Sequence, residues 1–127
     1  MSWTYTIDTE RKVLLGTAAG ILEAEELQTG VATATRDPRF HPDMRIFLDY
    51  RAVTELRFSI DTMEMMARNR VYSAKSRRAF LVPTAIDAGF FQYYRAIVET
   101  GRVEVFTDRA QALAWLNQGV RPEMVLT

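Results

Sequence analysis

The sequence predicts a single α/β domain over residues 1–127, with a mixed, mostly parallel five-stranded sheet, an N-terminal antiparallel hairpin and four helices. First, 48% of the 127 residues are hydrophobic and 25% are charged, which is typical of a chain that buries one core. Second, the chain opens on two short strands joined by a polar turn. Third, every later strand is followed by a helical pattern, which favours parallel strands joined by right-handed crossovers. The expected order is β-β-α-β-α-β-α-β-α.

The first two strands are predicted from alternation and from the turn between them. Trp3, Tyr5 and Ile7 alternate with threonines, which is the period of a strand with one buried face. The polar residues 8–11 then form a turn, and a second strand follows at 12–17. Short polar connections of this kind join antiparallel strands, so we expect a hairpin.

A helix is predicted over residues 23–36. Glu23, Glu25 and Glu26 lie in its first turn, where carboxylates complement the positive end of the helix dipole. The helix ends at the sequence Arg36-Asp37-Pro38. The apolar stripe that we expect to face the sheet is Ala24, Leu27, Val31 and Ala34.

The central strand is predicted at Arg45–Tyr50, because a nearly continuous apolar run is typical of a strand covered on both faces. A second helix follows Phe58, with Ser59 at the N-cap and Asp61 in the first turn. Its apolar stripe is Ile60, Met63, Ala67, Val71 and Ala74.

Two more strand–helix units complete the pattern. A buried strand is expected at 79–82, and a third helix at 87–100. The last strand is expected at 103–106, and Asp108-Arg109-Ala110-Gln111 resembles a capping box that opens a final helix. The residues expected to point inward are Phe90, Phe91, Tyr94, Ile97 and Val98 on the third helix, and Leu113 and Leu116 on the fourth.

Composition argues against several kinds of site. The chain has no cysteine and one histidine, His41, so thiolate chemistry is excluded and we expect no metal and no cofactor. Sixteen basic and sixteen acidic residues give a formal net charge of zero, which disfavours nucleic-acid binding. No nucleophile elbow, dinucleotide fingerprint or Walker A motif occurs, so we assign no catalytic residue and expect no enzymatic activity.

The sequence also carries no pattern that indicates a membrane. Its longest apolar runs fall far short of the roughly 20 residues that cross a bilayer. Its N-terminus lacks the basic start and apolar run of a signal peptide. We therefore expect a cytoplasmic protein without a membrane span.

Two stretches resemble the STAS-like, or SpoIIAA-like, superfamily of bacterial anti-sigma-factor antagonists. Arg45–Tyr50 resembles the family's central strand ending in aspartate, and Val105–Leu116 resembles its closing strand and helix. Small bacterial STAS-like proteins, related in fold to CRAL-TRIO lipid-binding domains, are the nearer comparison. The resemblance implies a SpoIIAA-like fold and a phosphorylatable Ser or Thr at the start of the helix after the central strand. Ser59 would inherit that role here, without the family's flanking Asp and Gly; its alternative role is a helix cap.

Five basic residues lie within positions 68–78, with no acidic residue among them. Such a cluster can bind a phosphorylated ligand, an acidic partner or an anionic headgroup. The alternative is a solvated group of cations that complements the end of a helix. The five are Arg68, Arg70, Lys75, Arg77 and Arg78, of which we take Arg77 and Arg78 as binding candidates.

Three further binding candidates follow from position and residue type. Asp49 ends the central strand, and ligands of open α/β sheets gather at the carboxyl ends of strands. Met65 lies across the second helix from Met63, and the neighbours Tyr93 and Tyr94 cannot both point inward. We expect Met65 or Tyr93 to reach the surface, at a homodimer contact or at the lip of an apolar pocket. The alternative is that these side chains are core.

Two functions remain open on the sequence alone. The first is a non-enzymatic, STAS-like interaction or regulatory module that docks a protein partner or itself through the face around the second helix. The second is a carrier or sensor that holds a small apolar or anionic, lipid-like ligand between the helices and the sheet. A flat exposed apolar patch would favour docking, whereas a lined pocket would favour the carrier.

Overall fold

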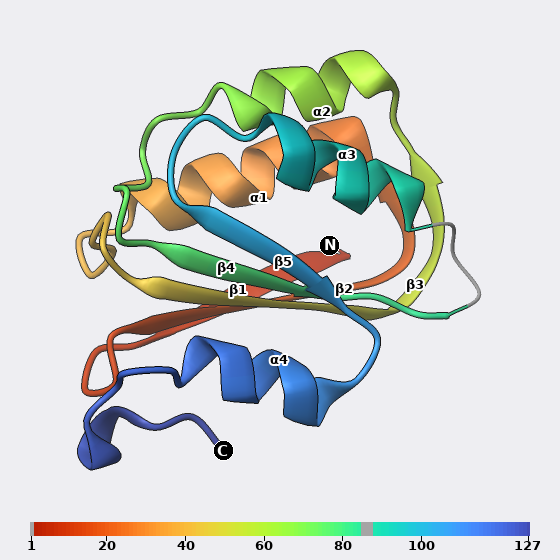
Figure 1. Cartoon of the computed structure of the whole chain (residues 1–127). Coiled ribbons are helices and arrows are strands. Elements are labelled where there is room, and N and C mark those ends of the chain that lie inside the picture. The colour runs from red at the N-terminus through yellow and green to blue at the C-terminus, as the bar shows by residue number, and fades with distance from the viewer. Residues whose placement is uncertain (1, 85–87) are drawn as a thin grey trace.

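The computed structural model describes residues 2–84 and 88–127, and it confirms the predicted order of elements (Figure 1). No helix in these ranges is long and apolar enough to cross a membrane. The elements are β1 (Trp3–Asp8), β2 (Val13–Glu23), α1 (Ala24–Arg36), β3 (Arg45–Arg57), α2 (Ile60–Ala67), β4 (Arg77–Leu81), α3 (Gly89–Ile97), β5 (Arg102–Phe106), α4 (Arg109–Leu116) and a final 3₁₀ turn, Pro122–Met124.

The five strands lie side by side in sequence order, β1-β2-β3-β4-β5. β1 and β2 form the expected antiparallel hairpin, and every later pair is parallel. Because each right-handed crossover steps to the next strand in the same direction, α1, α2 and α3 all lie on one face of the sheet (Figure 1). α4 follows β5 and lies on the opposite face.

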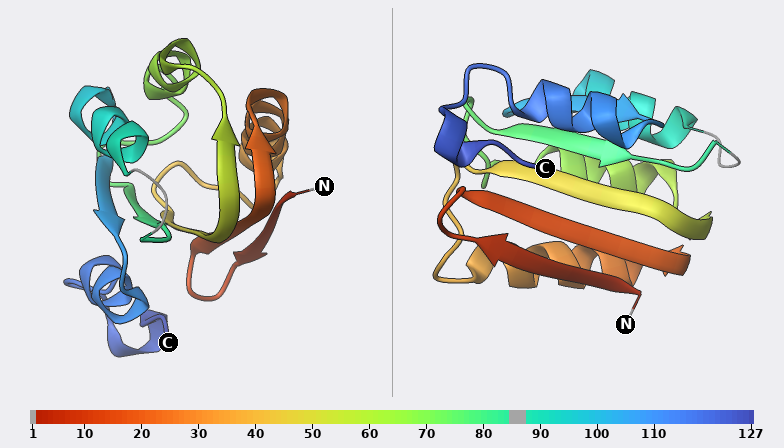
Figure 2. Two further views of the ribbon diagram at one scale, coloured as in Figure 1. Left: turned by 90° about the vertical axis from the view of Figure 1, so that its right-hand side faces the viewer. Right: turned by 90° about the horizontal axis from the view of Figure 1, so that it is seen from below.

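Each face of the sheet carries its own hydrophobic core. The larger core lies between the sheet and the layer formed by α1, α2 and α3. The smaller core lies under α4, which packs against β4 and β5. Its buried members are Val13, Phe47, Ala79, Leu81, Ala112, Leu116 and Leu126. None of them comes from β1, and Figure 2 (right) shows β1 and most of β2 without a helix in front of them.

Trp3 anchors the first strand to the larger core. Its indole N–H donates to the hydroxyl of Tyr50 at 2.8 Å, and its side chain is 3% exposed. The ring fits against two glycines: a Cβ built on Gly30 of α1 would lie 2.7 Å from Cδ2, and one built on Gly16 of β2 would lie 3.2 Å from Cζ2. Both glycines therefore make room for the indole.

The boundaries of several elements differ from the prediction. β2 and β3 continue past the predicted ends, to Glu23 and Arg57, because their outer halves pair through shifts of register next to Gly20, whose φ is 68°. α2 ends at Ala67, so the stripe does not continue along the helix to Val71 and Ala74. α3 covers only Gly89–Ile97, and the predicted start at residue 87 lies outside the described residues.

Candidate functional site

The side of β1 and β2 that faces away from α1 is exposed, and we call this surface the bare sheet face. It consists of Thr4 of β1 and of Leu15, Thr17, Ala19 and Ile21 of β2, which alternate with buried residues along the strand. Leu15 is 37% exposed and Ile21 is 41% exposed. β2 and β3 form a parallel pair, and both faces of a parallel sheet are normally covered. The open face of β2 is therefore unusual.

Two adjoining hollows lie on the bare sheet face and meet at Thr17 and Asp49, which line both. One hollow, of about 360 Å³, runs from Leu15 toward α4 and the C-terminal segment. The other, of about 560 Å³, runs along Thr4 and Ala19 toward β3. The carboxylate of Asp49 is thus placed at the centre of this surface.

Asp49 is held by Arg51, two residues further along β3. The guanidinium donates from Nε to Oδ1 at 3.0 Å and from Nη2 to Oδ2 at 2.8 Å. These hydrogen bonds to the Arg51 side chain hold the pKa of Asp49 below its usual value, against a smaller opposing effect of desolvation. Asp49 is therefore an ionised carboxylate whose charge is already balanced by its neighbour. Its role as a binding residue remains a prediction.

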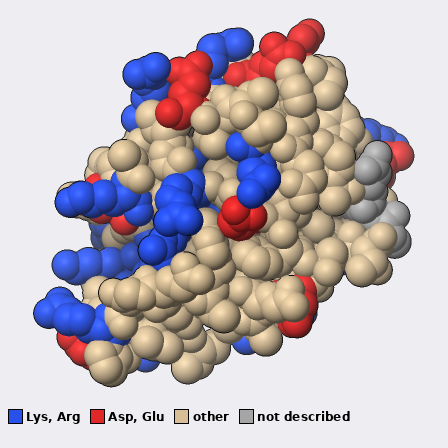
Figure 3. Space-filling model, in the orientation of Figure 1, with Lys and Arg blue, Asp and Glu red and all other residues tan. Residues whose placement is uncertain are grey.

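Lysine and arginine side chains gather at one end of the molecule, on the left in Figure 3. Here a hollow of about 360 Å³ is lined by Lys12, Arg45, Lys75 and Arg77, and also by Asp43. Arg77 donates from Nη1 to the carbonyls of Trp115 and Gln118, at 3.1 and 2.9 Å. Its charge complements the C-terminal end of α4, which is the helix-end role left open by the sequence.

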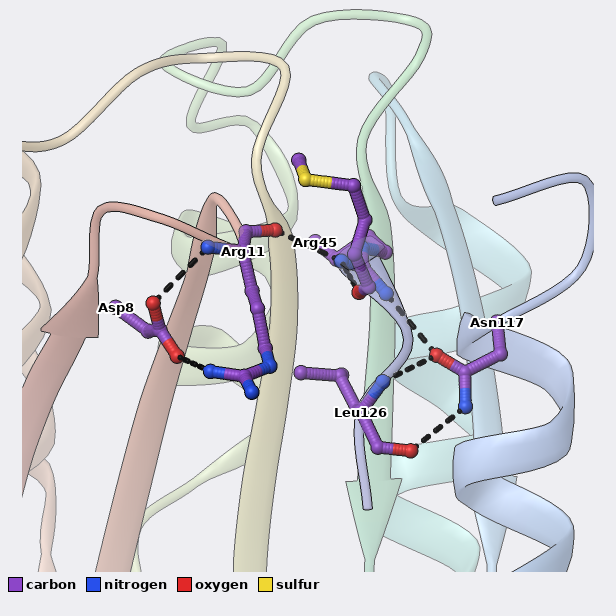
Figure 4. Close-up of polar contacts among 6 residues, drawn as sticks. Asp8, Arg11, Arg45, Asn117 and Leu126 are labelled. Atoms are coloured by element: carbon purple, nitrogen blue, oxygen red, sulfur yellow. Dashed lines mark hydrogen bonds and ion pairs between the residues drawn. The ribbon is translucent and has the colours of Figure 1, made fainter. Parts of the chain in front are cut away.

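Arg45 lines this hollow and joins three separate segments (Figure 4). Its Nη2 donates to the carbonyls of Arg11 in the β1–β2 turn, at 2.8 Å, and of Met124 near the C-terminus, at 2.6 Å. Its Nη1 donates to the side-chain oxygen of Asn117 at 3.1 Å. Asn117 in turn makes two hydrogen bonds to the backbone of Leu126. Arg45 thus fixes the hairpin, the end of α4 and the C-terminal segment to one another.

The five basic residues at positions 68–78 do not gather at one place in the structure. Arg70 lies at the surface and pairs with Glu99, its Nη2 lying 2.9 Å from Oε1. Arg77 and Arg78 are neighbours on β4, so their side chains lie on opposite faces of the sheet. Arg77 reaches the basic hollow, whereas Arg78 is 1% exposed.

Arg78 lies inside the larger core. Nη1 donates to the hydroxyl of Tyr94 and Nη2 donates to the carbonyl of Thr100, both at 2.5 Å. The guanidinium carbon lies 4.0 Å from the centre of the Tyr72 ring. Nε is buried and has no hydrogen-bond partner among the described residues. The sequence contained a signal for this placement, because strict alternation puts Arg78 on the same face as the core residue Phe80.

Ser59 occupies the N-cap position of α2, as predicted, and is exposed. Its side chain makes no capping hydrogen bond, which corrects the expectation that it caps the helix through its hydroxyl. Asp108 does cap α4, because its Oδ1 accepts from the N–H of Ala110 at 2.9 Å. Whether Ser59 is phosphorylated remains a prediction.

The surface of α2 and α3 places Met65 and Tyr93 differently. Met65 is 47% exposed, and Ile60 on the same helix is 46% exposed. Tyr93 is half-buried and donates to Oε1 of Glu64 at 3.2 Å, while its neighbour Tyr94 is buried. Ile60 and Met65 are five residues apart, so they lie on different sides of the helix.

His41 is exposed in the loop before β3. Its Nδ1 accepts a hydrogen bond from the backbone N–H of Asp43 at 3.1 Å, and Ser73 donates directly to the Asp43 carboxylate. Because the serine contacts the aspartate and not the imidazole, the group lacks the order of a Ser-His-Asp triad. Within residues 2–84 and 88–127, no group of three His, Cys, Asp or Glu residues is arranged to hold a metal ion.

A single sheet with one antiparallel hairpin, three helices on one face and a closing helix on the other defines a SpoIIAA-like α/β fold. The structure is similar to that of an uncharacterized DUF3478-family protein with a SpoIIAA-like fold from Shewanella loihica PV-4. That match has a TM-score of 0.61 at 16% sequence identity, and it covers 91% of this chain and 94% of the other. No family model matches the sequence, and no curated protein matches it.

Proposed function

We propose that this chain is a non-enzymatic interaction module that docks a second copy of itself through the bare sheet face. The observation that carries the proposal is the uncovered β1–β2 surface next to the parallel pair of β2 and β3, with Leu15 and Ile21 exposed at 37% and 41%. Covering two large aliphatic side chains removes apolar area from water, which is the main driving force of association. The docking surface thus lies on the sheet and not around α2, where the sequence suggested it.

The charges of the bare sheet face favour a second copy as the occupant. A two-fold contact places the same patch opposite itself, so an unbalanced charge would lie opposite a charge of the same sign and repel it. At the centre of the face, Asp49 is neutralised by the two hydrogen bonds from Arg51. At its edge, Asp8 pairs with Arg11 at 3.1 Å. The remaining exposed residues at the centre are threonine, alanine and aliphatic side chains, which suit a neutral self-contact.

The test is the oligomeric state of matched variants, measured by native mass spectrometry and sedimentation at several concentrations. We expect the wild-type chain to dimerise. Leu15→Glu should weaken the dimer at least tenfold, because it places a carboxylate in the contact. Met65→Glu makes the same kind of change at a somewhat more exposed site on α2 and should leave the dimer intact. A wild-type chain that stays monomeric, or a Leu15→Glu variant that dimerises as well as wild type, would refute the proposal.

A further inference from the structure

The buried guanidinium of Arg78 has fewer hydrogen-bond acceptors around it than it has N–H donors. A guanidinium carries five N–H donors. The structure supplies Arg78 with two hydrogen bonds, to the Tyr94 hydroxyl and the Thr100 carbonyl, and leaves Nε buried without a partner among the described residues. Buried donors are nearly always satisfied, so an orphaned one in the core requires an explanation.

The charge of Arg78 also has no counter-ion among the residues that the structure describes. Its described partners are a hydroxyl, a carbonyl and the Tyr72 ring, and no carboxylate in residues 2–84 or 88–127 forms an ion pair with it. Desolvation raises the pKa of Tyr72 to about 12 and also raises the pKa of Tyr94. Both phenols therefore stay neutral near pH 7 and cannot act as counter-ions. A buried cation without an anion is strongly unfavourable, even where an aromatic ring offsets part of the penalty.

A cavity adjoins this cation. It has a volume of about 40 Å³ and is lined by Arg78 and by aromatic and apolar side chains from the sheet, α1, α2 and α3. Tyr50, Phe80 and Phe91 form part of its wall. Sites for drug-sized ligands have roughly 300–1,000 Å³, whereas roughly 10–15 Å³ already admits a water. The cavity therefore suits a few non-hydrogen atoms, which excludes a long acyl chain in this conformation.

We propose that this cavity is a binding site for a small monocarboxylate, of the size of formate or acetate, whose carboxylate accepts hydrogen bonds from Arg78. The carboxylate would supply the negative charge that no described residue provides, because guanidinium and carboxylate match as a two-pronged pair. The short alkyl part would lie against the aromatic wall. The site is separate from the bare sheet face, because Arg78 lies on the opposite side of the sheet, and it stands whether or not the chain dimerises.

The test is a titration of the ¹⁵N-labelled chain with sodium acetate at constant ionic strength, followed by the arginine Nε–H resonances. Arg78→Met removes the Arg78 resonance and so assigns it. Arg68→Met makes the same change at the exposed C-cap position of α2 and serves as the control. We expect the Arg78 resonance to shift and saturate with acetate, in the wild type and in Arg68→Met. Acetate should also raise the thermal midpoint of both proteins, but not that of Arg78→Met.

Further arms of the titration decide the class of ligand. Acetamide has the shape of acetate without its charge and should leave the resonance unmoved. Octanoate should bind at least tenfold more weakly than acetate, because the cavity has no room for its chain. The proposal is overturned if acetate leaves the Arg78 resonance unmoved, if acetamide or chloride moves it equally, or if octanoate binds more tightly. These comparisons use the wild-type chain, in which the Arg78 resonance can also be assigned from nuclear Overhauser contacts to the Tyr72 and Tyr94 rings, so they hold even if Arg78→Met fails to fold.

Discussion

Replacing Gly30 with alanine should destabilise the protein, although the same change normally stabilises a helix. Gly30 lies inside α1, where alanine is favoured over glycine by about 1 kcal/mol. Here the added methyl group would lie 2.7 Å from Cδ2 of Trp3 and closer still to Cε3. Carbon atoms pack at about 3.5–4.0 Å, so either the indole or the helix must move.

The size of the effect follows from what holds the indole. Overpacking a core costs about 1–3 kcal/mol. If Trp3 moves, its 2.8 Å hydrogen bond to Tyr50 breaks as well. A buried donor left without a partner costs about 1–3 kcal/mol. After the gain in helix propensity, we expect Gly30→Ala to lose about 2 kcal/mol or more of unfolding free energy, which lowers the thermal midpoint by roughly 8 °C in a chain of this size.

The assay is urea and thermal unfolding followed by circular dichroism. Thr29→Ala changes the preceding, exposed residue of the same helix and should be neutral or slightly stabilising. Adding Trp3→Leu should remove most of the effect, so that Gly30→Ala costs little in the Trp3→Leu background. A Gly30→Ala variant as stable as wild type, or more stable, would refute the packing described for Trp3.

Three further predictions concern polar contacts. Arg45→Met should lower the unfolding free energy by about 3 kcal/mol in urea denaturation, because one buried and two half-buried carbonyls lose a charged donor. A loss below about 1 kcal/mol would contradict the role of this residue. The side-chain hydrogen bond from Arg39 holds the pKa of Asp37 well below its usual range. The stability that the ionised Asp37 carboxylate contributes is therefore fully present above about pH 4, and it is lost as the pH falls through the folded-state pKa. Asp37→Asn should therefore lose less stability than wild type between pH 4 and pH 2 in acid-unfolding curves, and parallel curves would exclude this contribution. Ser59→Ala should change the unfolding free energy by less than about 0.5 kcal/mol, whereas Asp108→Ala should lower it by about 1 kcal/mol. The reason is that the Asp108 side chain accepts a capping hydrogen bond and the Ser59 side chain does not. Equal losses of unfolding free energy in the two variants would contradict this difference.

The order of elements could be predicted because each element carries its own local signal. Alternation marked β1, and apolar runs marked the buried parts of β3 and β4. The outer half of β3, from Arg51 to Arg57, has mostly exposed positions, so it carries no apolar run to be recognised. Its pairing with β2 depends on the shifts of register near Gly20, which are set by tertiary structure and leave no periodic pattern.

The candidate site was harder to predict, because charges that are adjacent in the sequence of a strand point to opposite faces of the sheet. Arg77 and Arg78 are adjacent in sequence, but one caps α4 and the other is buried beside Tyr94. Arg45 gave no signal of its own, since its partners lie 34 and 79 residues away along the chain. Contacts of that separation exist only once the sheet has brought the segments together.

The sequence order of the five strands has a consequence for synthesis on the ribosome. Each newly translated strand finds its neighbour already present, so the sheet can grow one strand at a time from the N-terminal hairpin. The contacts of Arg45 with Asn117 and Met124 can form only after those two residues have left the exit tunnel. Nascent chains that stop before α4 should therefore hold a nearly finished sheet whose second core is still open to water.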